Sequence, residues 1–210
     1  MDQPEIKAAD LLLRPWRRSD GADLARAWED PDILRWGRYG AVVPGAGNVG
    51  QWVDWNHDQW HFGLRAGFAV CAAGGDGVGE RGGSGGGELV GSIMLRGYGG
   101  SSADAGQRGN TGEAGYWVVP GWRGRGVATL ALGALGRWAF APTEEGGLGL
   151  RRIELRHSVA NPASCRVAAK AGFAHEGTLR GSMRYADGDW HDEHLHARLF
   201  GDPGFSDARE

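Results

Sequence analysis

The sequence has few cysteines: only Cys71 and Cys165 occur among its 210 residues. Two cysteines without a CxxC spacing form no disulfide framework, which favours a protein of the reducing cytoplasm. We expect Cys71 to be a small buried apolar residue. The sequence also lacks an apolar run of about 18 residues, so it predicts no membrane-spanning helix. Its first ten residues have neither the basic nor the apolar region of a secretory signal.

Neither sign of charge dominates the chain. It carries 23 lysines and arginines against 26 aspartates and glutamates, a formal net charge of −3. A dedicated nucleic-acid-binding protein has a dominant basic face, so this balance argues against nucleic acid as a partner. Hydrophobic residues make up 41% of the chain, which is sufficient for a folded core. The length indicates one domain, which we place at 9–200, with flexible termini at 1–8 and 201–210.

Glycine is in excess, with 39 residues. Much of this excess lies in 74–87 and 97–112, without the Gly-x-y period of collagen. We interpret 74–87 as a flexible loop insertion, because it contains no GxxxxGK[ST] phosphate-binding pattern. Segment 37–47 is also too rich in glycine and proline for regular structure.

Hydrophobic periodicity predicts the remaining elements. In 49–61, the positions of Val49, Trp52 and Val53 indicate a helical stripe, which we assign to core packing rather than to an aromatic wall over a substrate cleft. The whole pattern predicts strands at 10–16, 67–73, 88–97, 113–119, 151–159, 173–185 and 190–199, and helices at 20–29, 32–36, 49–61, 126–141 and 162–171. This order predicts an α+β (mixed α/β) fold, with a single mixed, mostly antiparallel sheet of about seven strands and helices on both faces.

The segment GWRGRGVAT stands between a predicted strand and the longest predicted helix. A helix start leaves its first N–H groups unpaired and carries about half a positive charge. Gly124 and Gly126 leave room for an anion at the backbone. Arg123 and Arg125 add full charges, and Thr129 adds a hydroxyl. The segment therefore predicts a diphosphate site. The alternative is an ordinary glycine-rich turn; a Rossmann GxGxxG is excluded because its third glycine position is Thr129.

A second segment, Asn161-Pro162-Ala163-Ser164, opens the helix predicted at 162–171. Asparagine suits the N-cap of a helix and proline its first position. On this interpretation alone, Asn161 and Ser164 are only capping residues.

Together the two segments resemble the GNAT acetyltransferases. RGRGVA fits their Q/R-x-x-G-x-G/A acyl-CoA signature at Arg123, Gly126 and Ala128. GYWVVPGWRGRGVATLAL, followed about thirty residues later by VANPASCRVAAKAGF, is similar to the RimJ/RimL branch, which acetylates N-terminal amines of ribosomal proteins. The resemblance runs from 11 to 200, with the glycine-rich segments as insertions.

This resemblance implies that acetyl-CoA is the cofactor. Its diphosphate would sit on the amides of 123–129, Val127 included. Its pantetheine would follow the strand edge formed by Trp117, Val118 and Val119. A backbone N–H of Trp117 or Val118 would polarise the thioester carbonyl. Asn161 would hold the pantetheine or the thioester end.

The chain departs from the GNAT pattern at one position. Many GNAT enzymes place a tyrosine seven residues after the asparagine, where this chain has Ala168. The RimJ/RimL branch instead carries a serine three residues after it, and Ser164 stands there. We therefore assign Ser164 the hydroxyl that faces the departing thiolate. A thiolate with a pKa of about 8.5 needs little help to leave.

The amine that attacks must be neutral. The pKa of an α-amino group is roughly 7.7–8.0 and that of lysine is near 10.4, so a protein or peptide N-terminus needs the weaker base. Glu113, at the start of the predicted cofactor strand, is the candidate catalytic base. The alternative is an exposed carboxylate at a strand end.

Three histidines, His191, His194 and His196, raise the question of a metal. An HxH pattern in a strand puts two imidazoles on one face. No cysteine or third ligand follows at a useful spacing, so the sequence predicts no metal site.

We therefore expect an acetyl-CoA-dependent N-acetyltransferase in which an amine attacks the thioester directly in a ternary complex. The expected acceptor is the N-terminal amine of a protein or peptide. An aminoglycoside or polyamine acceptor, and a succinyl-CoA donor, are the alternatives. A non-catalytic acyl-CoA sensor would keep the diphosphate site and lack an amine site. Exposed tryptophans near 52–60 would indicate a homodimer.

Overall fold

The structure, a computed structural model, describes residues 2–37, 48–72, 87–98 and 110–203. The expected insertion at 74–87 lies outside these residues except for Gly87. Most of the expected tail at 201–210 also lies outside them. Within the described part, no helix is long and apolar enough to cross a membrane.

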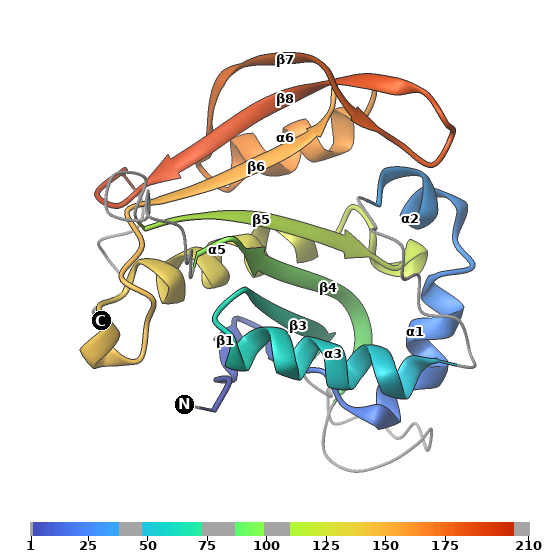
Figure 1. Cartoon of the computed structure of the whole chain (residues 1–210), viewed down its shortest axis with the longest axis vertical. Coiled ribbons are helices and arrows are strands. Elements are labelled where there is room, and N and C mark those ends of the chain that lie inside the picture. Colours follow the sequence, from blue (N-terminus) through green and yellow to red (C-terminus); the bar gives the residue numbers. More distant parts are fainter. Residues whose placement is uncertain (1, 38–47, 73–86, 99–109, 204–210) are drawn as a thin grey trace.

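One mixed sheet organises the molecule (Figure 1). Its strands are β1 (Ile6–Ala8), β2 (Leu11–Pro15), β3 (Arg65–Ala72), β4 (Glu88–Arg96), β5 (Thr111–Val118), β6 (Arg152–Ser158), β7 (Ala174–Arg184) and β8 (Trp190–Leu199). They lie in the order β1-β2-β3-β4-β5-β6-β8-β7. Only the pairing of β5 with β6 is parallel among these strands. The mixed, mostly antiparallel sheet is therefore confirmed.

The sheet has eight strands rather than about seven, because the N-terminal segment is part of it. β1 pairs with β2, with Ile6 opposite Leu13. The side-chain amide of Gln3 also donates a hydrogen bond to the carbonyl of Gly67 at 2.8 Å. The prediction of a flexible terminus at 1–8 is therefore wrong for this strand, whose three residues are too few to show a hydrophobic period.

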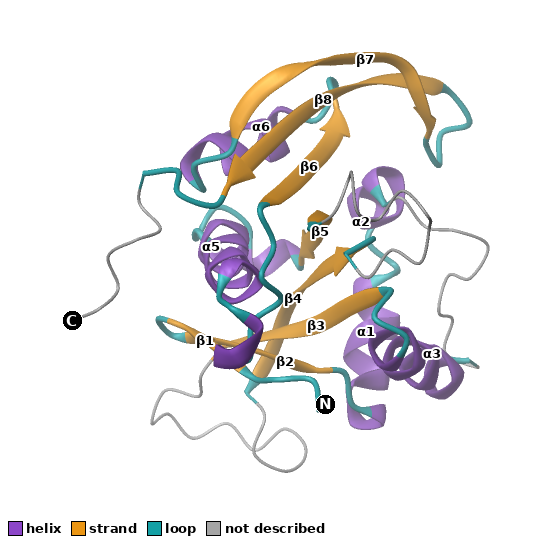
Figure 2. Ribbon diagram, turned by 60° about the vertical axis from the view of Figure 1, so that its left-hand side comes forward, coloured by secondary structure: helices purple, strands orange, loops and turns teal. Residues whose placement is uncertain are grey.

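Helices cover both faces of the sheet, as predicted (Figure 2). They are α1 (Gly21–Ala27), α2 (Pro31–Trp36), α3 (Val49–His61), α5 (Val127–Phe140) and α6 (Pro162–Lys170), with 3₁₀ turns at Arg18–Asp20, Pro120–Trp122 and Thr143–Glu145. One buried cluster packs α5 and part of α6 against the sheet, and a second packs α1 and α3 against its other face.

β3 contributes to both clusters because its side chains alternate between the faces. Phe68 belongs to the cluster under α5, whereas Cys71 belongs to the cluster under α3. Trp52 and Val53 are buried in this second cluster, which confirms core packing for the stripe in α3. Cys71 is 1% exposed, which confirms its prediction as a buried apolar residue.

The sheet opens where its two parallel strands separate. Pairing between β5 and β6 ends at Ala114 and Leu155. β5 stays paired with β4 as far as Val118, and β6 stays paired with β8 as far as Ser158. Because each strand continues with its other neighbour, the two strands diverge, and Figure 1 shows β6 rising away from β5. The candidate site lies at this opening.

Candidate active site

A cavity of about 650 Å³ lies between the end of β5, the start of α5 and α6. It collects most of the residues that the sequence predicts for the cofactor: Trp117, Val118, Arg123, Gly124, Gly126, Val127, Ala128, Thr129, Asn161 and Ser164. Val119 and Arg125 do not line it. Arg125 instead lies over the ring of Trp122, with its guanidinium carbon 5.1 Å from the ring centroid. We call this cavity the cofactor cleft.

The start of α5 is built to receive an anion. Gly126 is the N-cap of the helix, and both Gly124 and Gly126 have positive φ, at +76° and +84°. A side-chain carbon at either position would meet no atom of the described residues within 4 Å. The first N–H groups of α5 have no partner within the helix. Open glycines beside free amides fit the diphosphate of an acyl-CoA.

The charge of Arg123 is not free for this anion. Its guanidinium pairs with Asp30 at 2.5 Å and with Asp32 at 3.1 Å, and its Nε donates to the carbonyl of Val118 at 3.1 Å. Burial alone would raise the pKa of Asp30, but hydrogen bonds from Arg123 and from the N–H of Ile33 hold it below its usual value. Arg123 thus ties α2 to β5, a long-range pairing that the local motif does not predict.

Two basic residues of α6 line the cofactor cleft instead. Arg166 and Lys170 are four residues apart, so they share one face of the helix. Sequence reasoning missed them, although their helical spacing within the predicted helix was a usable signal. They add positive charge to the wall that faces the start of α5.

The backbone of β5 offers a donor to the opening. The N–H of Val119 bonds to the carbonyl of Val90 in β4 at 3.0 Å. Because N–H directions alternate along a strand, the N–H of Val118 points away from β4, toward the side where β6 has diverged. Of the two donors considered from the sequence, the direction of this N–H favours Val118 over Trp117.

Asn161 and Ser164 adopt the capping geometry expected of them. Asn161 is the N-cap of α6, and its Oδ1 accepts a hydrogen bond from the N–H of Ser164 at 3.2 Å. Both residues also line the cofactor cleft. The cap therefore fixes the position of the Ser164 hydroxyl relative to the cleft.

Tyr116 is a further side chain of the cofactor cleft that sequence reasoning missed. Its hydroxyl lies 3.0 Å from Oγ of Ser164. Burial raises the pKa of Tyr116 to about 12, with the hydrogen bond to Ser164 acting in the opposite direction, so the phenol is neutral at pH 7. Ala168, where many GNAT enzymes carry tyrosine, is fully buried. A phenol therefore reaches the site from β5 rather than from α6.

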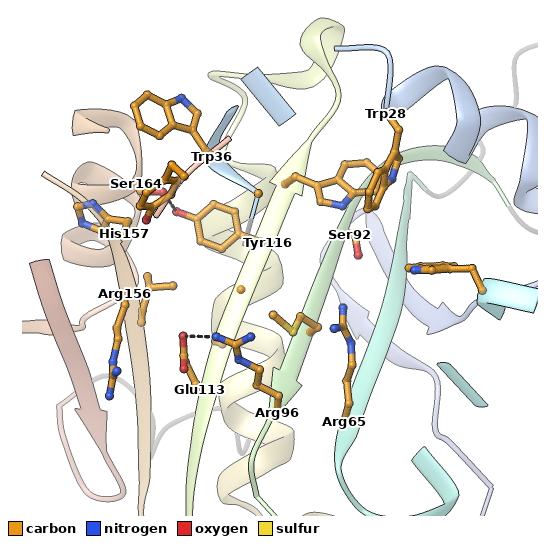
Figure 3. Close-up of a pocket in the computed structure, with 18 of the residues that line it drawn as sticks. Trp28, Trp36, Arg65, Ser92, Arg96, Glu113, Tyr116, Arg156, His157 and Ser164 are labelled. Carbon is orange, nitrogen blue, oxygen red and sulfur yellow. Dashed lines mark hydrogen bonds and ion pairs between the residues drawn. The ribbon is translucent and has the colours of Figure 1, made fainter. Parts of the chain in front are cut away.

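A second cavity of about 280 Å³ meets the cofactor cleft, and we call it the acceptor pocket. Trp36, Gly37, Tyr116, Trp117 and Ser164 line both cavities. The pocket is also lined by Trp28, Trp52 and Trp55. Figure 3 shows Trp28 on one side of the pocket and Ser164 on the other. The tryptophan stripe of α3 therefore serves the core and also supplies a pocket wall, the alternative considered from the sequence.

Arginines outnumber carboxylates in the described lining of the acceptor pocket. Its described lining includes Arg65, Arg96 and Arg156 but one carboxylate, Glu113. Arg96 donates to Glu113 at 2.9 Å (Figure 3). Arg156 donates to Glu154 at 2.7 Å. The candidate base therefore lies in the pocket, held in an ion pair.

The three histidines considered as metal ligands, His191, His194 and His196, do not form one group in the structure. His191 contacts Oγ of Ser158 at 2.8 Å and a carboxylate oxygen of Asp187 at 3.1 Å. His194 and His196 face a different group, which includes His157 of β6 and Cys165 of α6. Sequence spacing did not reveal this group, because His157 and Cys165 come from neighbouring elements of the fold.

An opened sheet with a helix N-terminus at the opening defines the class of fold, which is that of the solved acetyltransferases to which this chain is similar. The chain belongs to the GNAT acetyltransferase family, because the model of the acetyltransferase (GNAT) domain matches residues 10–174. This confirms the family assignment made from the sequence.

Several similar proteins are named as acetyltransferases of ribosomal proteins, in agreement with the resemblance to the RimJ/RimL branch. The chain is 35% identical over 89 residues to the ribosomal-protein-serine acetyltransferase of Escherichia coli, a match that covers 42% of this chain and 46% of that protein. Mycobacterium smegmatis RimJ in complex with CoA-disulfide has a TM-score of 0.73 and 22% identity over 93% of this chain and 86% of its own. The ribosomal-protein-S5-alanine acetyltransferase of Vibrio fischeri also has a TM-score of 0.73, with 17% identity over 95% and 98% of the two chains.

Proposed function

We propose that this protein transfers an acetyl group from acetyl-CoA to the N-terminal amine of a protein or peptide. The observation that carries the proposal is the junction of the two cavities at Tyr116, Trp117 and Ser164. An anion-binding cleft opens there into a pocket for a second molecule. A CoA sensor needs no such pocket, so the junction favours an enzyme. The curated relative that acts on a ribosomal protein supports the choice of acceptor.

Acetyl-CoA supplies the activated acyl group as a thioester. The amides at the start of α5 bind its diphosphate, and Arg166 and Lys170 add charge from the opposite wall. Asn161 holds the pantetheine end. The N–H of Val118 donates to the thioester oxygen, where negative charge develops during attack.

The Tyr116–Ser164 pair stabilises the negative charge at sulfur by hydrogen bonding. The Ser164 hydroxyl donates a hydrogen bond to the departing thiolate and accepts one from Tyr116, and the thiolate then takes up its proton from water. Because the phenol is neutral at pH 7, it acts as a donor and not as a base. The pair thus stabilises the thiolate without a charged acid.

The acceptor pocket favours an amine that arrives with little positive charge. Glu113 is the one carboxylate of the described lining, and it is already paired with Arg96, so the lining does not favour a bound ammonium and suits the neutral nucleophile. Polyamines and aminoglycosides carry several ammonium groups, which this lining offers few carboxylates to bind. A peptide N-terminus suits it better, because peptide carbonyl oxygens accept hydrogen bonds from arginine. The charged groups of the pocket therefore support the choice of a peptide N-terminus over a polyamine or an aminoglycoside.

The ion pair also changes the role proposed for Glu113. The carboxylate of Glu113 already accepts a hydrogen bond from Arg96 at 2.9 Å, so it is engaged in holding that side chain. We therefore assign Glu113 to the positioning of Arg96, and an α-amine transfers its proton to water. Glu113→Gln should raise KM for the peptide roughly tenfold and leave kcat and the acidic limb of its pH profile unchanged. If Glu113→Gln instead shifted the acidic limb of the pH profile of kcat and left KM unchanged, Glu113 would be the catalytic base.

The acceptor class is tested by CoA thiol release with acetyl-CoA and a panel of amines. We expect a peptide with a free N-terminus to give at least tenfold higher kcat/KM than spermidine or an aminoglycoside. The same peptide with its N-terminus blocked and an internal lysine free is the control, and it should give no more than background. Faster turnover of the polyamine would overturn the choice of acceptor. Release of no thiol with any amine, together with tight CoA binding, would favour the sensor.

A further inference from the structure

The register of the sheet gathers histidines on one face of β6, β8 and β7. His157 of β6 stands directly opposite His194 of β8. His175 of β7 stands opposite His196 of β8. His194 and His196 are two residues apart, so both point to the same face. α6 follows β6 in the chain and brings Cys165 to this group, with Sγ 3.9 Å from Nε2 of His196.

Hydrogen bonds to backbone carbonyls fix the ring nitrogens of two members. Nδ1 of His157 is 2.9 Å from the carbonyl of Ser158, and Nδ1 of His196 is 3.4 Å from that of Phe173. A carbonyl only accepts, so each Nδ1 carries the proton and each Nε2 keeps its lone pair. Metal-binding histidines use this arrangement, in which an outer carbonyl orients the ring.

Two nitrogens of the group lack the partner that buried polar atoms normally have. Nε2 of His157 and Nδ1 of His194 are buried and have no hydrogen-bond partner among the described residues. His157 as a whole is only 5% exposed. A buried nitrogen without a partner costs about 1–3 kcal/mol, so such atoms usually indicate a missing ion or water. The unsatisfied nitrogens are independent of the sequence pattern and point to a ligand.

We propose that His157, Cys165, His194 and His196 bind one Zn²⁺ ion. One donor atom from each residue lies within 4.8 Å of the others. Donor atoms around tetrahedral zinc lie about 3.3–3.8 Å apart, so side-chain rotations that move the donor atoms by roughly 1 Å would bring all four within binding distance of one ion. Three imidazoles and a thiol suit a borderline-soft cation, whereas Ca²⁺ and Mg²⁺ require oxygen ligands. Four protein ligands make the site a structural one.

A metal ion at this site would link α6 to the strand that precedes it, β6. Cys165 follows Ser164 directly in α6, and His157 lies near the end of β6. Metal binding would therefore fix the start of α6 against β6 and β8. Cys165 and His194 are partly exposed, which gives the ion a route to the group. The site is a separate inference that does not depend on the proposed acceptor.

The test uses the full chain without a histidine tag, stripped of metal by a chelator and titrated with Zn²⁺ or Co²⁺. We expect one ion per chain, a higher melting temperature with Zn²⁺, and a tetrahedral Co²⁺ spectrum with a thiolate-to-cobalt charge-transfer band. Cys165→Ser should lose that band, and His194→Gln should bind at least 100-fold more weakly. His191→Gln is the matched control, since it removes a histidine of the same strand outside the group. It should bind as the parent does.

Two results would overturn the proposal. One is a parent chain that binds neither ion in a one-to-one ratio. The other is binding by Cys165→Ser and His194→Gln equal to that of the parent. Far-ultraviolet circular dichroism checks that both variants are folded. Should either variant fail to fold, the Co²⁺ spectrum of the parent decides, because absence of the charge-transfer band excludes Cys165 as a ligand.

Discussion

Gly126→Ala is expected to weaken CoA binding at least tenfold. Gly126 has a φ of +84° at the N-cap of α5 and lines the cofactor cleft. A methyl group there would project beside the amides that bind the diphosphate. It would also favour a negative φ, which turns those amides away from the anion. Each charge-assisted hydrogen bond is worth about 1.5–3 kcal/mol, so loss of one accounts for the tenfold change. Isothermal titration calorimetry with CoA measures it.

Gly146→Ala provides the matched control. Gly146 has a φ of +81°, and a side-chain carbon there would also meet no described atom within 4 Å. It ends the 3₁₀ turn Thr143–Glu145 and lines neither cavity. Both variants should lose about 1–2 kcal/mol of unfolding free energy from left-handed alanine. Only Gly126→Ala should lose CoA affinity. Equal CoA affinities in the two variants would mean that the anion does not bind at the start of α5.

Sequence patterns predicted those elements for which consecutive residues contain all the evidence. The helix at Val127–Phe140 and the stripe of α3 repeat at helical spacing, so one window of sequence contains the evidence. The turn at Gly124 and Gly126 and the cap at Asn161 are equally local. Most of the cofactor cleft was therefore predictable, since its parts are loop and cap motifs of consecutive residues.

The remaining features depend on residues that are distant in sequence. Arg123 pairs with Asp30, which lies 93 residues earlier in the chain. Tyr116 meets Ser164 across 48 residues, because β5 and β6 separate at that level of the sheet. The histidine group requires the register of β6 with β8. None of these pairings has a period or a motif, so they follow only from the assembled sheet.

The Tyr116–Ser164 pair should carry the largest effect on turnover. Ser164→Ala is expected to lower kcat roughly 10- to 100-fold, with CoA affinity unchanged. This is no more than the low end of the effect of a general acid, because Ser164 only donates a hydrogen bond and a thiol with a pKa of about 8.5 leaves easily as the thiolate. Tyr116→Phe keeps the ring and removes only the hydroxyl, so it should lower kcat to a similar extent. Steady-state thiol release at saturating acetyl-CoA measures both effects.

The double variant tests whether the two hydroxyls act as one unit. In the structure they are 3.0 Å apart at the junction of the two cavities, so removing one leaves the other without its partner. We therefore expect the double variant to be no slower than the slower single variant, a strongly non-additive result. Ser92→Ala is the control, since its hydroxyl lines the acceptor pocket yet donates to the carbonyl of Phe68 at 3.1 Å and not to this pair. Its effect should add to that of Ser164→Ala. Additive losses of kcat from Tyr116→Phe and Ser164→Ala would show that the two hydroxyls work separately. An unchanged kcat in Ser164→Ala would remove the Ser164 hydroxyl from the mechanism.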